Sequence, residues 1–240
     1  MTVEEVASQL TQRISPALGH WFASCVERNS ENEAVTVLLS DEGQEALDGL
    51  VRLIESAAAV VGVEAREVLP LADFKPHDFT EENFNSVLAE LRTVMFLHRE
   101  RFSSIRLLPS NKQSPQCDLI ADRAGSRFAI EVKLITSATF QYPGHAKRRM
   151  NLSQRLKDEA TKAMSGQLAP VSMKSQRCDL RMIVIAVDSP KTITFTQPRQ
   201  LMDSLVEAYK ALEDASNFHI ALITGMADSG GMMYCYPEYN

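Results

Sequence analysis

Residues 117–135 read CDLIADRAGSRFAIEVKLI, a pattern typical of two short β-strands joined by a tight turn at Ala124-Gly125. Side chains on a strand alternate between its two faces. The apolar face of the second strand therefore consists of Phe128, Ile130, Val132 and Leu134. Its other face, the mixed face, consists of Arg127, Ala129, Glu131 and Lys133.

We expect three charged groups to meet at this hairpin. Glu131 and Lys133 share the mixed face, and Asp118 enters from the paired strand. Mg²⁺ takes oxygen ligands, usually one or two carboxylates, and keeps several waters. Held by Asp118 and Glu131, it would polarise a phosphate oxygen and lower the pKa of a water, while Lys133 orients that water. The pattern therefore indicates metal-assisted phosphodiester cleavage, with Mg²⁺ or Mn²⁺ as the cofactor.

A blander interpretation of the same residues stays open. Glu131-Val132-Lys133 is a short string that also fits a solvated polar strand face. The apolar opposite face and the upstream acid favour the functional interpretation.

Composition narrows the class of protein. The 240-residue chain is 45% hydrophobic and 23% charged, which is ordinary for a globular protein with a full core. Its apolar runs fall short of the ~18–20 residues of a membrane helix, and its acidic N-terminus lacks the order of a secretory signal. Its four cysteines are scattered, without a Cys-x-x-Cys pair. We expect a cytoplasmic protein with free thiols and no membrane association.

Charge is distributed unevenly along the chain. Residues 1–70 hold twelve acidic and four basic residues, a net charge of −8, whereas residues 71–240 carry +2. Positive charge collects in 141–165, directly after the Glu-Val-Lys strand, where a phosphate backbone would need to lie. For a single charge run such as this one, a solvated helix start is the better explanation. The basic residues are Lys147, Arg148, Arg149, Arg155, Lys157 and Lys162.

We expect two regions, a helical accessory region over 1–75 and a nuclease-like domain over 76–240. Apolar residues recur at helical spacing in 44–60, and two prolines suggest a linker over 70–79. The acidic first region has no catalytic pattern, which favours a role in binding a partner protein.

A helix is predicted from Thr80 as N-cap to about Glu100. Glu90 lies on its apolar stripe, bracketed by Val87 and Val94, and a buried carboxylate needs a partner such as a metal or a lysine. Glu90 at the edge of the stripe, paired with another residue or reaching solvent, remains an equal alternative.

The remaining elements alternate between strand and helix. The patterns predict strands over 104–108, 180–187, 218–224 and 232–236, and helices over 151–168 and 198–213.

The predicted order is a helix with Glu90, strands with Asp118 and Glu131-Val132-Lys133, a basic helix and a further strand. This order resembles the core of the PD-(D/E)xK nuclease superfamily over roughly residues 81–190, although Cys117 stands where the family name places a proline. The resemblance implies an α/β fold with a mixed central sheet flanked by helices, the restriction-endonuclease-like αβββαβ core, with an N-terminal helical extension.

The resemblance also implies roles for individual residues. Asp118 would bridge the metal, Glu131 would be its second ligand, Lys133 the catalytic lysine and Glu90 a helical acid near the metal. Nucleic-acid contacts would come from Lys147, Arg148, Arg149, Gln154, Arg155 and Lys157.

The implied function is a Mg²⁺-dependent nuclease acting on DNA, as one component of a bacterial defence or repair complex. A non-catalytic subunit that keeps the nuclease fold to bind nucleic acid or a protein is the alternative. The residues do not distinguish DNA from RNA, and cutting both strands would favour a homodimer.

Overall fold

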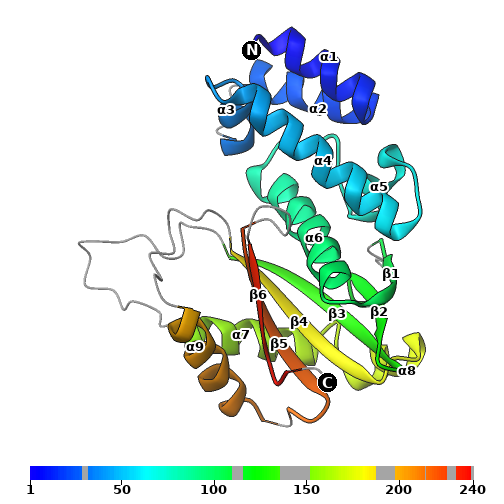
Figure 1. Cartoon of the computed structure of the whole chain (residues 1–240), viewed down its shortest axis with the longest axis vertical. Helices are drawn as coiled ribbons and strands as arrows, with labels where there is room; N and C mark the ends of the chain where they lie inside the picture. The colour runs from blue at the N-terminus through cyan, green and yellow to red at the C-terminus, as the bar shows by residue number, and fades with distance from the viewer. Residues whose placement is uncertain are drawn as a thin grey trace, which may run out of the picture. The chain divides into compact units, whose positions relative to one another are not determined.

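Packing divides the chain, seen here as a computed structural model, into two units, Met1–Met95 and Phe96–Asn240 (Figure 1). This packing boundary lies inside a long helix, later in the chain than the boundary at 75/76 that the prolines suggest. The residues that the structure describes are 1–28, 32–109, 116–135, 152–187, 198–213, 215–225 and 231–238.

The described regular elements of the first unit are helices, as its helical periodicity predicts. Helix α1 begins with a capping box in which Thr2 and Glu5 each satisfy the other's backbone N–H. Helix α4, which covers the predicted stretch 44–60, ends at Gly62 in the left-handed conformation. The helices are α1 (Val3–Arg13), α2 (Pro16–Glu27), α3 (Glu33–Leu38), α4 (Gly43–Val61), α5 (Ala65–Leu71) and most of α6 (Glu81–Arg99).

The segment 70–79 packs into the first unit and is not the open linker that its prolines suggest. Phe74 is buried, and its ring meets Trp21 and Phe84 edge-on. The Trp21 ring stacks on Phe84 at 4.5 Å, and its indole N–H donates to the backbone oxygen of Asp78 at 3.0 Å. Pairs of buried aromatic rings such as these add to the free energy of burial.

Helix α6 starts where the sequence predicts. The hydroxyl of Thr80 accepts a hydrogen bond from the backbone N–H of Asn83 at 3.4 Å, which confirms Thr80 as the N-cap. Glu81 and Glu82 lie in the first turn, where the helix dipole favours acidic side chains.

The second unit is an α/β fold built on a six-stranded mixed sheet, in the order β1-β2-β3-β4-β5-β6. The first three strands form an antiparallel meander, β3, β4 and β5 run parallel, and β6 returns antiparallel to β5. The strands are β1 (Ser103–Leu107), β2 (Leu119–Arg123), β3 (Ser126–Ile135), β4 (Leu180–Val187), β5 (Phe218–Thr224) and β6 (Met232–Tyr236).

The hairpin between β2 and β3 turns at the predicted position. Arg123 pairs with Ser126, and the two residues between them, Ala124 and Gly125, have φ angles of 50° and 81°. Two consecutive positive φ angles are the geometry of a type I′ turn, whose twist matches that of the paired strands.

Helices α7 (Leu152–Ser165) and α9 (Pro198–Lys210) pack against one face of this sheet and against each other (Figure 1). Leu156 of α7 and Leu205 of α9 are fully buried there. The same core takes Ala129 and Ile135 of β3, so the mixed face of β3 is covered by helices and is not a solvated surface. Burial at both faces is typical of central strands in α/β sheets.

Two features of this unit lie outside the predicted pattern. A short helix, α8 (Pro170–Gln176), follows α7, and its N-terminal proline needs no backbone hydrogen bond there.

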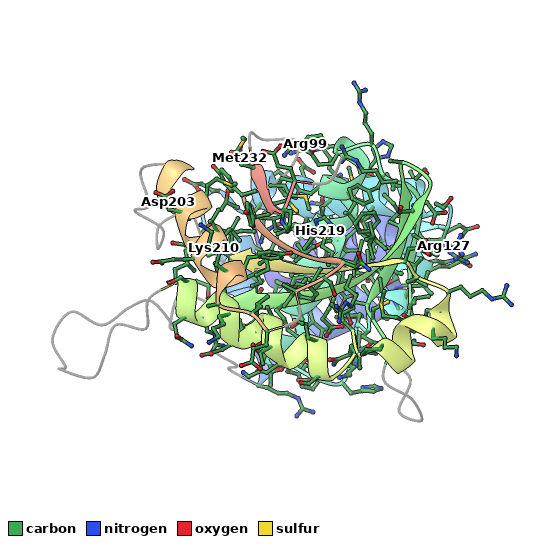
Figure 2. All side chains as sticks on the ribbon, turned by 90° about the horizontal axis from the view of Figure 1, so that it is seen from below. Arg99, Arg127, Asp203, Lys210, His219 and Met232 are labelled. Atoms are coloured by element: carbon green, nitrogen blue, oxygen red, sulfur yellow. The ribbon has the colours of Figure 1, made fainter. Side chains whose placement is uncertain are left out.

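At the far edge of the sheet, the Arg99 guanidinium donates to the backbone oxygen of Gly231 at 2.7 Å, beside Met232 (Figure 2).

Among the described residues, no helix is both long and apolar enough to cross a membrane.

Candidate active site

Asp118 lies immediately before β2, where the ladder with β3 ends. Its carboxylate Oδ2 accepts a hydrogen bond from the backbone N–H of Val132 at 2.7 Å, and its own backbone oxygen accepts from Leu108 at 2.8 Å. The carboxylate therefore occupies the position that a further β2 residue would take opposite β3. The hydrogen bond from Val132 places the Asp118 carboxylate beside Glu131 and Lys133, which flank Val132.

Glu131 and Lys133 lie on the face of β3 that α7 and α9 cover. Their partners on β4 are Ile183 and Ile185, which are both buried in the core of that face. Glu131 is only 1% exposed, which is rare for an acidic side chain unless it is paired.

Lys133 forms a hydrogen bond with only one of the two carboxylate oxygens of Glu131. Its ammonium donates to Oε1 of Glu131 at 2.5 Å. The other oxygen, Oε2, is buried and has no hydrogen-bond partner among the described residues. A buried, unpaired carboxylate oxygen costs free energy, so its presence in a folded protein calls for an explanation.

The electrostatics of the site follow from this geometry. Burial first, and then the Asp118 carboxylate, raise the pKa of Glu131 to about 7, against the opposing effect of Lys133. Burial alone would lower the pKa of Lys133, but its ion pair with Glu131 and the nearby carboxylates of Asp118 and Glu159 raise it overall. The site therefore holds more negative charge than its degree of burial favours.

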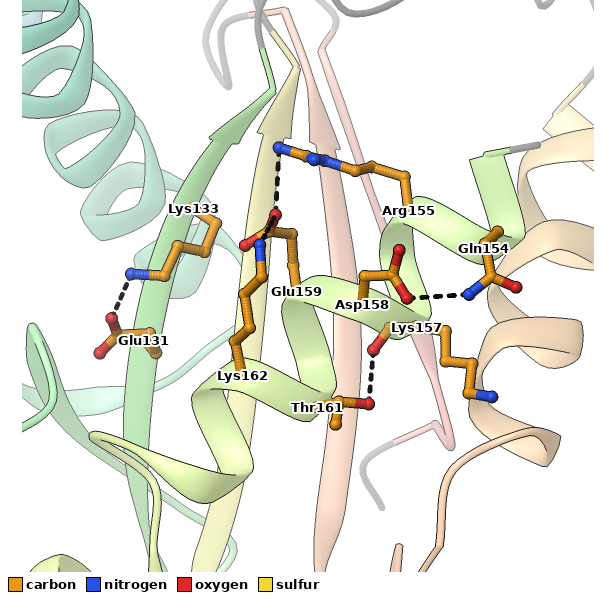
Figure 3. Close-up of polar contacts among 9 residues, drawn as sticks. All are labelled: Glu131, Lys133, Gln154, Arg155, Lys157, Asp158, Glu159, Thr161 and Lys162. Carbon is orange, nitrogen blue, oxygen red and sulfur yellow. Dashed lines mark hydrogen bonds and ion pairs between the residues drawn. The ribbon is translucent and has the colours of Figure 1, made fainter. Parts of the chain in front are cut away.

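Helix α7 contributes a second set of charged residues on the same side. Arg155 and Lys162 both donate to Oε1 of Glu159 at 3.1 Å, and Glu159 is 7% exposed (Figure 3). Glu159 lies near enough to raise the pKa of Lys133. Charged side chains therefore extend from Asp118, just before β2, through Glu131 and Lys133 on β3 to α7.

The predicted phosphate contacts on α7 lie on different sides of the helix. Arg155 is on the side of Glu131 and Lys133, whereas Gln154 and Lys157 point away from β3 (Figure 3). The Gln154 amide donates to Asp158 at 2.8 Å on the exposed surface. Of these residues, only Arg155 shares a side of α7 with the site.

The remaining predicted residues are not placed in this cluster. Glu90 is partly buried on α6 and belongs to the first unit, so its approach to a metal stays a prediction. Lys147, Arg148 and Arg149 lie outside the described residues.

Glu159 is the member of this network that sequence reasoning missed. The signal was present, because Glu159 lies on the apolar stripe of its helix, three residues after Leu156 and four before Ala163. The argument that singled out Glu90 applies equally well to it.

Asp118 and Glu131 are the residues that could hold a divalent cation. Hard cations prefer carboxylate oxygens, and a cation would satisfy Oε2 of Glu131 and offset the excess negative charge. No group of three or more acidic, histidine or cysteine side chains within the described part of the chain is arranged to hold a metal. A site with two carboxylates suits Mg²⁺, which commonly keeps waters as its other ligands.

No protein-family model, curated protein or solved structure matches this chain. The argument for function therefore depends on the chemistry of these side chains.

Proposed function

We propose that this protein is a Mg²⁺-dependent nuclease that hydrolyses DNA phosphodiester bonds at Asp118, Glu131 and Lys133. One observation carries the proposal. The hydrogen bond from Val132 to Asp118 holds a carboxylate beside the Glu131–Lys133 pair, and Glu131 keeps a buried oxygen without a partner. Such a group of charges on paired strands is rigid enough to position reacting atoms.

In this proposal the two carboxylates would bind the metal, and the lysine would interact with the phosphate or with the attacking water. When bound, Mg²⁺ supplies a Lewis acid for a phosphate oxygen and a water of lowered pKa. Asp118 and Glu131 would hold it at the sheet, and a cation there would weaken the hold of Glu131 on the Lys133 ammonium. Lys133, whose side chain is 31% exposed, could then donate to a phosphate oxygen or to the attacking water.

The order of elements supports membership of the PD-(D/E)xK superfamily as part of this proposal. In the chain, α6 precedes the meander β1-β2-β3, and α7 and α8 precede β4, which pairs in parallel with β3. Glu131 and Lys133 lie on β3, and Asp118 lies immediately before β2, which is compatible with the placement that the resemblance implies. A place in a bacterial defence or repair complex is proposed by analogy only.

A second candidate is a nuclease-like subunit that binds nucleic acid or a partner protein without cutting. The observation that favours it is the ion pair of Lys133 with the buried Glu131, which holds the lysine on a carboxylate of its own strand. In that case the Glu131–Lys133 ion pair would serve the stability of the fold alone.

Cleavage of DNA by purified protein separates the two candidates. Single- and double-stranded DNA would be incubated with Mg²⁺, with Mn²⁺ and with EDTA. We expect metal-dependent cleavage that is lost in Asp118→Asn and Lys133→Ala. Asp122→Asn is the matched control, because Asp122 lies on β2 but forms an ion pair with Arg127 at 2.8 Å. Activity that survives both site substitutions would exclude this site, and inactivity of the wild type would favour the binding subunit.

A further inference from the structure

One flank of α7 presents two cations joined by one buried carboxylate. Arg155, Glu159 and Lys162 are spaced four and three residues apart, which places them on one side of a helix. Both cations donate to the same oxygen of Glu159, at 3.1 Å each. The three side chains together carry a net charge of +1.

The donors of these cations are incompletely used. The Arg155 side chain is 28% exposed and the Lys162 side chain is 66% exposed, so donors of both side chains can reach a ligand from solvent. A guanidinium has five N–H donors in a planar fork that suits a phosphate. Glu159 occupies one edge of this fork and leaves other donors for a ligand.

This flank faces the candidate active site. Figure 3 shows Arg155, Glu159 and Lys162 on the side of α7 that faces Lys133 on β3. Lys157, on the same helix, points away from β3. A nucleic acid with one phosphate at Lys133 would therefore pass Arg155 and Lys162 and miss Lys157.

We propose that Arg155 and Lys162 form a phosphate-binding position for the backbone of DNA, and that Glu159 is the positioning residue that holds both on the Lys133 side of α7. The inference rests on the proposed function, because it places the second phosphate of the substrate cut at Lys133. Glu159 fixes the two side chains before DNA arrives, which reduces the loss of side-chain entropy on binding.

The first test measures binding without cleavage. A fluorescein-labelled DNA duplex would be titrated with the Asp118→Asn protein in EDTA at several salt concentrations. A phosphate contact contributes about 0.9 to the slope of log K against log salt. We expect Arg155→Ala and Lys162→Ala each to lower the slope by about 1 and to weaken binding about tenfold near 50 mM salt.

Lys157→Ala is the matched control, since it removes one positive charge from the opposite side of the same helix. We expect it to change the affinity by about twofold or less, because salt screens charges that do not touch the DNA. Thermal unfolding of each variant would show that the fold is retained.

The second test addresses the positioning role. Glu159→Gln keeps the size of the side chain and an acceptor oxygen but removes the charge. We expect tighter DNA binding, from lost repulsion, together with slower cleavage at saturating DNA in the protein with Asp118 intact. A residue that matters only for stability would weaken both properties together.

The outcomes separate this inference from the function on which it rests. A wild type that does not cleave, but whose DNA affinity depends on Arg155 and Lys162 and not on Lys157, would remove the nuclease proposal and keep the phosphate position. Equal salt slopes for all three alanine variants, or no binding to DNA at low salt, would overturn the phosphate position.

Discussion

Replacing Glu131 with Gln is expected to change the stability of the protein in a pH-dependent way. In the folded protein, burial and the Asp118 carboxylate raise the pKa of Glu131 from 4.5 to about 7. Between these two pKa values the folded state binds more protons than the unfolded state. The free energy of unfolding therefore falls as the pH rises from about 4.5 through 7, and the Gln variant, which cannot ionise, lacks this loss.

The magnitude follows from the size of the shift. Raising the pKa by about 2.5 units corresponds to about 3.5 kcal/mol, at about 1.4 kcal/mol for each unit. About 2 kcal/mol of this falls between pH 5.5 and 8.5, since part of the loss is complete below that range. In the wild type, Lys133 adds little to this change, because its ion pair with Glu131 and the nearby carboxylates raise its pKa above the ordinary value of a lysine.

Chemical or thermal unfolding of the wild type and of Glu131→Gln would be measured at pH 5.5 and pH 8.5 in EDTA. From pH 5.5 to pH 8.5, we expect the free energy of unfolding of the variant to rise by about 2 kcal/mol relative to that of the wild type. This difference corresponds to about 4–8 °C in melting temperature. Asp122→Asn is the control, because hydrogen bonding to Arg127 lowers the pKa of Asp122 and its carboxylate stays ionised throughout the window.

A constant difference in stability between Glu131→Gln and the wild type at both pH values would refute the reasoning. It would mean that Glu131 ionises at the same pH in the folded and unfolded states, and that the site does not hold excess negative charge.

Three further results are expected. Millimolar Mg²⁺ or Mn²⁺ should raise the melting temperature of the wild type at pH 8, because a ligand that binds only the folded state stabilises it, and should leave Asp118→Asn unchanged in the same thermal scan. Leu156→Ala, in the core under the sheet, should lose about 2–5 kcal/mol of unfolding free energy, while the exposed Thr161→Ala stays within about 0.5 kcal/mol, as denaturant titration would show. Ala124→Gly should gain about 1 kcal/mol in the same titration, because alanine at a φ of 50° is strained and glycine is not, whereas Gly125→Ala should lose a similar amount.

The strands of the second unit were predictable because each has a strong local signal. The predicted bounds of β4, β5 and β6 match those of the structure. The first two are short continuous apolar runs with β-branched residues, which fit strands buried on both faces. The β2–β3 hairpin was equally clear, because period-two alternation flanks a turn dipeptide that contains glycine.

The first unit was less predictable, and so was the division between the units. Pro70 and Pro76 interrupt regular structure and suggest a linker, but the buried ring of Phe74 holds their segment in the aromatic core with Trp21 and Phe84. Proline limits backbone conformation and says nothing of which side chains a segment buries.

The sequence by itself determined the α/β class of the second unit, its strands, and the convergence of Asp118 with Glu131 and Lys133, because periodicity and turn chemistry are local properties. Tertiary structure alone decided that α7 covers the face of β3 that carries these charges. This coverage buries Glu131, raises its pKa and brings Arg155 and Glu159, but not Lys157, to the side of Lys133. Alternation along a strand assigns residues to two faces. Which face a helix covers, and therefore which charged groups are removed from water, depends on how α7 packs against the sheet.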